Sequence, residues 1–98
     1  MDPVDETRAL FAISVAADLV GTGVQNLRAY ERRGLVTPQR TEGGTRLYAQ
    51  VDIDRLKRIT ELLAAGLNLA GVESVFHLEG ENARLRAEID RLRSAPGR

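Results

Sequence analysis

The sequence contains no cysteine and no tryptophan, and its aromatic residues are two phenylalanines and two tyrosines in 98 positions. Without cysteine the chain can form neither a disulfide nor a thiolate metal site, and it has no thiol nucleophile. No apolar run reaches the length of a membrane span, and the acidic start MDPVDET does not resemble a signal peptide. We therefore expect one small cytoplasmic domain.

Groups that carry catalysis or bind cofactors are also missing. The one histidine, His77, has no acid or thiol beside it to form a ligand set, and we interpret it as an exposed or interface residue. There is no Gly-rich phosphate loop at a strand-helix junction and no Ser/His/Asp set on a plausible scaffold. We expect no enzyme activity, no cofactor and no bound metal.

Net charge is absent too, because 14 basic residues balance 14 acidic ones. Their distribution is uneven. Residues 1–23 carry one basic and four acidic residues (−3), residues 24–58 carry eight and four (+4), and residues 59–98 carry five and six (−1). This segregation favours one surface for an anionic partner, although a charged surface can also acquire such an excess by chance.

Residues 22–38, TGVQNLRAYERRGLVTP, predict a short amphipathic helix. Thr22 and Gln25 form a capping-box pattern at its start, and Gly34 followed by Pro38 predicts its end. At helical spacing its polar side contains Gln25, Arg28 and Arg32. A helix this short is not stable alone in water, so other elements must present it.

A preceding helix is predicted at residues 14–21, SVAADLVG, with Ser14 as its cap and Gly21 at its end. The tight turn between the two helices is typical of a helix-turn-helix. An ordinary helical hairpin within a bundle is the alternative, but it leaves Arg28, Arg32 and Arg33 unexplained.

Residues 35–50 have the pattern of a β-hairpin. Two short runs flank residues 42–44, EGG, and paired glycines permit the positive dihedral angles of tight hairpin loops. We predict a two-stranded wing with Arg40 and Arg46 near its turn. Because such a hairpin is marginal alone, it must pack on the helices, and we expect Tyr48 in the core.

Two further helices are predicted at residues 50–63 and 68–79, the second capped by Asn68. Gly80 is then expected to break the chain, followed by a separate polar helix at residues 81–94. That helix carries a seven-residue seam of Asn82, Leu85, Ile89 and Leu92. The seam cannot be buried within a monomer, so we expect a homodimer in which the asparagine helps to fix register. A frayed polar tail is the alternative.

LRAYERRGLVTPQR followed by GGTRLY closely resembles the DNA-binding domain of the MerR family of bacterial transcription regulators. FAISVAADLVG, RTEGGTRLY and LNLAGVE further resemble its heat-shock-repressor (HspR-like) branch. The resemblance implies a mainly α fold: a winged helix-turn-helix with a small two-stranded β-hairpin, two further helices and a C-terminal helix in an antiparallel coiled coil. The domains are then a flexible tail at 1–11, the winged helix-turn-helix at 12–79, the dimerisation helix at 80–94 and a loose tail at 95–98.

The resemblance also implies the DNA contacts. Arg28 and Tyr30 match positions that contact phosphates, and Arg46 matches the wing arginine. Gln25 and Asn26 fall where base-reading side chains sit, and both suit adenine. The predicted DNA-binding set is Thr22, Gln25, Asn26, Arg28, Tyr30, Arg33, Arg40 and Arg46, and the predicted dimerisation set is Asn82, Leu85, Ile89 and Leu92.

These features predict a nucleoid-associated repressor that binds inverted-repeat promoter DNA as a homodimer. Two alternatives are a dimeric module that docks a chaperone or another regulator, and a small architectural or excisionase-like DNA-binding factor. The missing cysteines exclude the metal-sensing branch, and no effector domain follows the seam. We therefore expect regulation through a protein co-regulator or loss of the dimer, with no small-molecule sensing.

Overall fold

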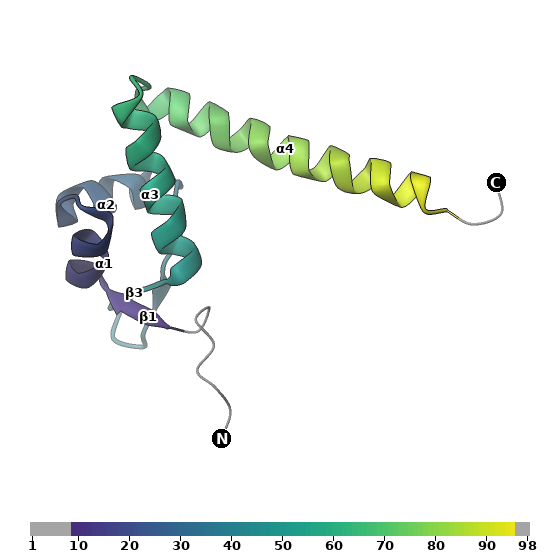
Figure 1. The fold of residues 1–98 in the computed structure, drawn as a ribbon. Coiled ribbons are helices and arrows are strands. Elements are labelled where there is room, and N and C mark those ends of the chain that lie inside the picture. Colours follow the sequence, from purple (N-terminus) through teal and green to yellow (C-terminus); the bar gives the residue numbers. More distant parts are fainter. Residues whose placement is uncertain (1–8, 96–98) are drawn as a thin grey trace.

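The computed structural model describes residues 9–95, so most of the predicted tails, residues 1–8 and 96–98, lies outside the described residues. The elements in order are β1 Leu10–Ala12, α1 Ile13–Val20, α2 Val24–Arg32, β2 Gln39–Arg40, β3 Arg46–Ala49, α3 Gln50–Ala64 and α4 Leu69–Arg93. The first three helices and the strands form a compact body from which α4 projects (Figure 1). The predicted mainly α class with a small wing is confirmed.

The three strands form one antiparallel sheet in the order β1-β3-β2. Strands β2 and β3 are the predicted hairpin, with Arg40 opposite Arg46. Strand β1 was not predicted. It pairs with β3 so that Phe11 lies opposite Tyr48. The assignment of Leu10 and Phe11 to the tail is therefore wrong, because distant pairing supplies hydrogen bonds that three residues cannot supply locally.

Glycines define the turns of the body, as predicted. Gly21 ends α1 with φ of 84°, and Gly34 follows α2 with φ of 76°, a region that L side chains rarely adopt. In the wing turn, Gly44 has φ of 87° and its N–H donates to the Thr41 carbonyl at 2.9 Å. These three backbone positions fix how α1, α2 and the wing follow one another.

The predicted caps of the first two helices are wrong. Helix α1 starts directly after β1, so Ser14 lies within its first turn and caps nothing. At the start of α2 the capping position belongs to Gly23, one residue later than predicted, and no side chain caps it. The Thr22 hydroxyl instead accepts a hydrogen bond from the Asn26 side-chain amide at 2.7 Å. The Thr22–Gln25 capping box therefore does not form.

The core lies between the sheet and α1, α2 and α3. Its largest fully buried side chains are Tyr48, Leu27, Ile53, Leu56, Ile59 and Val72. Only the first turns of α4 contribute to this core, through Val72 and the partly buried Leu69 and Phe76. The body therefore holds α4 at one end only.

Helix α4 has 25 residues and is about 37 Å long. Its predicted cap is confirmed, because the Asn68 side-chain oxygen accepts a hydrogen bond from the Gly71 N–H at 2.8 Å. The helix continues through Gly80, so the predicted break and the domain boundary there are wrong. One glycine in an exposed helix costs only about 1 kcal/mol relative to alanine. The projection explains a radius of gyration of 16.9 Å, against about 13 Å for a compact chain of this length.

Candidate nucleic-acid interface

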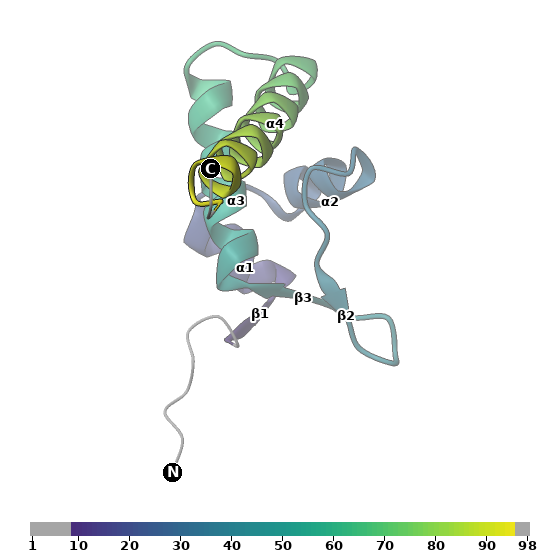
Figure 2. The same cartoon turned by 90° about the vertical axis from the view of Figure 1, so that its right-hand side faces the viewer.

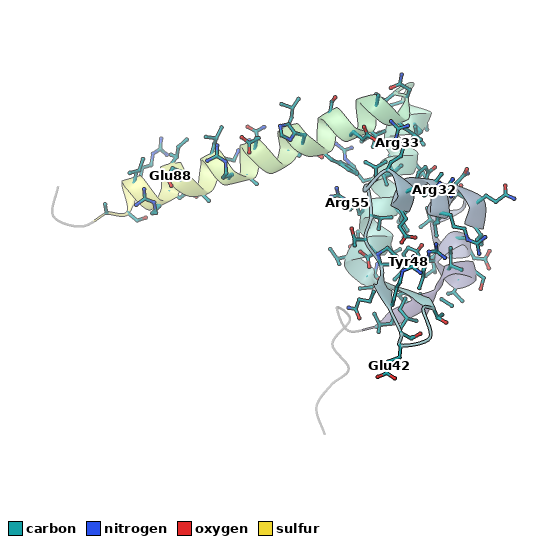
Figure 3. The ribbon with its side chains drawn as sticks, turned by 180° about the vertical axis from the view of Figure 1, so that it is seen from behind. Arg32, Arg33, Glu42, Tyr48, Arg55 and Glu88 are labelled. Carbon is teal, nitrogen blue, oxygen red and sulfur yellow. The ribbon has the colours of Figure 1, made fainter. Side chains whose placement is uncertain are left out.

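Helix α2 presents a polar side because its other side is anchored in the core. Leu27 is fully buried and Tyr30 is only 5% exposed. On the outer side, Gln25, Arg28 and Arg32 are exposed, and Arg32 is visible there in Figure 3. Within residues 9–95 neither of these two arginines forms an ion pair. Both guanidinium groups are therefore available to an anion.

The N-terminal end of α2 carries the residues predicted to read bases. Asn26 uses one amide N–H in its hydrogen bond to Thr22, which orients its side chain and leaves its carbonyl oxygen available. Gln25 is exposed and makes no side-chain hydrogen bond to another described residue. Thr22 thus has a role that differs from the predicted contact with DNA, since it positions Asn26.

The wing lies on the same side of the body as α2, as the view along α4 shows (Figure 2). The two are joined by Glu31, which lies in the last turn of α2. Its carboxylate accepts one hydrogen bond from Arg46 Nε at 2.5 Å and another from Arg40 Nη2 at 2.8 Å. The expectation that Glu31 pairs with a nearby arginine is confirmed, and it takes both wing arginines.

This pairing holds Glu31 ionised. The hydrogen bond from Arg46 is the main cause that lowers the pKa of the Glu31 carboxyl below its ordinary value, and Arg40 adds to the effect. The same hydrogen bond raises the pKa of the Arg46 guanidinium. The cluster of Glu31, Arg40 and Arg46 therefore carries one net positive charge, where the sequence suggested two.

The two tyrosines belong to the core. Tyr48 is fully buried, as predicted, and its hydroxyl is the one buried side-chain polar atom without a hydrogen-bond partner in the described part of the chain. Burial also raises the pKa of Tyr30. A side chain this buried can offer DNA little beyond its hydroxyl. Tyr30 is therefore the least accessible member of the predicted DNA-binding set.

Arg33, also predicted to bind DNA, joins two helices of the protein. Its Nε donates to the Glu73 carboxylate at 2.6 Å, which links the end of α2 to the first turns of α4 (Figure 3). Nearby, the Arg55 guanidinium lies 4.1 Å from the centre of the Phe76 ring and donates to the Leu35 carbonyl. These contacts attach α4 to the body, and sequence spacing did not reveal them.

Beyond the body, α4 carries an exposed apolar stripe. Leu85, Ile89 and Leu92, from the predicted dimerisation set, are 48%, 47% and 58% exposed. Leu78 is 62% exposed and was missed, because the predicted break at Gly80 separated it from the seam. With the helix unbroken, Leu78 falls one heptad before Leu85 and extends the same stripe.

Residues 11–78 match the family model described as "MerR HTH family regulatory protein". The chain belongs to the MerR family. The resemblance identified from the two linked motifs is therefore confirmed. It includes the wing and the helix-turn-helix together, and the match ends within α4.

Named relatives place this MerR-family chain beside transcriptional regulators. It is 42% identical over 91 residues to the heat shock protein HspR of Streptomyces coelicolor, covering 92% of this chain and 60% of that protein. It is 42% identical over 67 residues to the transcriptional regulator GlnR of Bacillus anthracis, covering 68% of this chain and 52% of that protein. The chain thus spans between half and two thirds of these relatives' length. The expected HspR-like branch is supported, and none of these relatives is named as an enzyme.

Two solved structures share the fold of this MerR-family chain. A MerR-family transcriptional regulator from Bacillus cereus matches with a TM-score of 0.66 and 26% identity, covering 86% of this chain and 72% of that one. The regulator HiNmlR, crystallised with promoter DNA and lacking a sensor domain, matches with a TM-score of 0.63 and 22% identity, covering 86% and 78%.

Within the described residues, no helix combines the length and apolar character needed to cross a membrane, and no group of three His, Cys, Asp or Glu side chains is placed to hold a metal ion.

Proposed function

We propose that this MerR-family chain is a cytoplasmic, nucleoid-associated transcriptional repressor that binds inverted-repeat promoter DNA as a homodimer. The observation that carries the proposal is the common surface of α2 and the wing. Exposed Arg28 and Arg32 lie on α2, and the wing arginines are attached to the same helix through Glu31. The structural neighbour HiNmlR was crystallised on promoter DNA, which supports this use of the fold.

In this proposal α2 is the helix that enters the major groove. Gln25 and the Thr22-oriented Asn26 lie near its N-terminal end, where recognition helices contact base edges. Their amides can pair in a bidentate manner with adenine. Arg28 and Arg32 contact phosphates and fix the register of the helix, a role that carries no sequence information itself.

The apolar stripe on α4 supports a dimer. Full burial of a leucine or isoleucine side chain contributes about 1.5–3 kcal/mol relative to exposure. Two antiparallel copies of α4 related by a two-fold axis between residues 83 and 84 would match every position of the stripe. The facing pairs are then Val75 with Leu92, Leu78 with Ile89, and Asn82 with Leu85.

The flanks of that register also carry complementary charge. Glu79 of one copy lies beside the Arg86 of the other copy on the e edge of the heptad, and the symmetry repeats this pair. Within one chain Glu79 already accepts from Arg58 at 3.2 Å. Glu79 would thus connect α3, its own α4 and the second copy.

Selection of bound fragments from a bacterial genomic library, followed by electrophoretic shift on the selected DNA, tests the proposal. We expect an inverted repeat and an affinity that falls steeply with salt. If Arg28 and Arg32 each neutralise one phosphate per subunit, the double alanine variant of a dimer should reduce the slope of log affinity against log salt by about 3.6.

The matched control is Arg84→Ala, which removes an exposed arginine from α4 that pairs with Glu81 within its own helix. Its slope should equal that of the wild type. A wild type that selects no DNA would contradict the proposal and favour a dimeric module that docks a chaperone or another regulator. Recovery of fragments without any shared sequence would favour an architectural factor.

A further inference from the structure

Glu31 is the one acidic residue in α2, and it lies beside the surface proposed to bind DNA. A carboxylate there repels a polyanion, which weakens binding unless it serves another purpose. Its side chain is 20% exposed and accepts hydrogen bonds from arginines on both strands of the wing. Its contacts therefore indicate what that purpose is.

The carboxylate of Glu31 joins three elements. Oε1 accepts from Arg46 on β3, and Oε2 accepts from Arg40 on β2. Arg40 also donates from Nη1 to the Gly44 carbonyl in the wing turn at 3.0 Å. One side chain of α2 thus fixes both strands of the wing and, through Arg40, its turn.

Without this carboxylate the wing would contain an unfavourable charge pair. Arg40 and Arg46 are directly opposite on neighbouring strands, where like charges are destabilising. The lowered pKa of Glu31 keeps its negative charge present at neutral pH. Glu31 therefore offsets repulsion between the two guanidinium groups and holds them in one orientation.

The pairing leaves the outer edge of Arg46 available. Arg46 donates to Glu31 through Nε alone, and the described residues give its two terminal nitrogens no hydrogen-bond partner. A guanidinium has five N–H donors in a fixed fork, so four remain for an anion such as phosphate. A phosphate can therefore bind Arg46 without displacing Glu31.

We propose, on the basis of the function proposed above, that Glu31 is a positioning residue that determines DNA specificity. It fixes the wing relative to α2, so that a phosphate bound by Arg46 determines which bases Gln25 and Asn26 can reach. Removing Glu31 raises the net positive charge of the surface yet loosens this geometry. Binding to the operator should then fall while binding to unrelated DNA holds or rises.

The experiment compares the intact wild-type protein with Glu31→Ala and Arg46→Lys. Dissociation constants are measured for the selected operator and for an unrelated duplex of equal length, over a salt series. Hydrogen bonds to charged groups of this kind change binding by roughly tenfold to a hundredfold. We expect both variants to lose about tenfold or more of the ratio between operator and unrelated binding. Lysine keeps the charge of Arg46 but cannot donate to Glu31 and a phosphate in the same fixed geometry.

The matched control is Glu88→Ala, because Glu88 also pairs with an arginine at 2.5 Å but lies far out on α4. It should leave the ratio unchanged. Equal gains in affinity for both duplexes in Glu31→Ala would overturn the proposal, since they would make Glu31 a simple electrostatic brake. Unchanged affinities would overturn it as well.

A second measurement needs no DNA and separates this inference from the proposed function. In nitrogen-15 spectra of the free protein, the Arg46 Nε–H should exchange with water more slowly than that of exposed Arg28, and Glu31→Ala should remove the difference. Rapid exchange in the wild type would contradict the role of Glu31 alone. A protected Arg46 in a protein that binds no operator would contradict the proposed function alone.

Discussion

Replacing Tyr48 with phenylalanine removes one hydroxyl that has no hydrogen-bond partner among residues 9–95. The ring is fully buried, and phenylalanine keeps the rest of its shape. An unpartnered buried hydroxyl costs about 1–3 kcal/mol, and the loss of one oxygen's packing contacts returns part of that gain. We expect the free energy of unfolding to rise by about 1 kcal/mol. For a domain of this size the melting temperature should rise by about 4–8 °C.

The advantage of Tyr48→Phe should increase in alkali. Burial is the main cause that raises the pKa of Tyr48 above its ordinary value of 10.0, and the charge of Glu31 adds to it. Above the unfolded-state pKa the folded protein binds more protons, so wild-type stability falls as pH rises towards the raised folded-state pKa. This loss reaches at most about 1.4 kcal/mol per pH unit for one group. The alkaline range is easy to interpret, because Lys57 is the only lysine and Tyr30 the only other tyrosine.

The assay is chemical denaturation followed by circular dichroism, from neutral pH to about pH 11. All samples need one protein concentration, because the stability of a dimer depends on it. Tyr30→Phe is the matched control. It removes the same atom from a nearly buried ring whose hydroxyl is not among the unpartnered buried atoms. If both variants lose stability equally at neutral pH, the Tyr48 hydroxyl has a partner in solution and the reasoning is refuted.

Two substitutions on α4 test its continuity and its stripe. Gly80→Ala should raise the free energy of unfolding by about 0.5–1 kcal/mol in thermal denaturation, because an added Cβ would have no heavy atom within 4 Å; a lower stability would indicate that the chain bends there. Leu85→Asp should yield monomers on sedimentation, because it places a carboxylate within the apolar seam, whereas Ala87→Asp on the outer side of the helix should remain dimeric. A monomeric wild type would refute the dimer directly.

Local chemistry made the turns predictable. Gly21, Gly34 and the glycines of the wing turn occur where positive φ angles are required, and the asparagine cap of α4 depends on residues three apart. Strand β1 was not predictable in this way, because its partner in β3 is distant and three residues show no periodicity. The break expected at Gly80 overestimated one glycine, since favourable helix-forming residues on both sides maintain the helix.

The candidate site was predicted in composition but not in connectivity. Helical spacing placed Gln25, Arg28 and Arg32 together on the outer side of α2, and the structure has all three exposed. Spacing could not show that Arg33 pairs with Glu73 on another helix. Nor could it show that one carboxylate takes both wing arginines. Such pairs depend on how elements dock, so a basic residue in the sequence is not yet a free positive charge.

The single attachment of α4 has a consequence for operator geometry. From its start to the proposed two-fold axis α4 spans about 15 residues, which makes each arm about 22 Å long. In the dimer this arm acts as a ruler, since it sets the separation and the rotation of the two recognition helices. Removing seven residues would shorten each arm by about 10 Å and keep the stripe facing its partner. The spacing between operator half-sites is thus encoded in the length of a helix that touches no DNA itself.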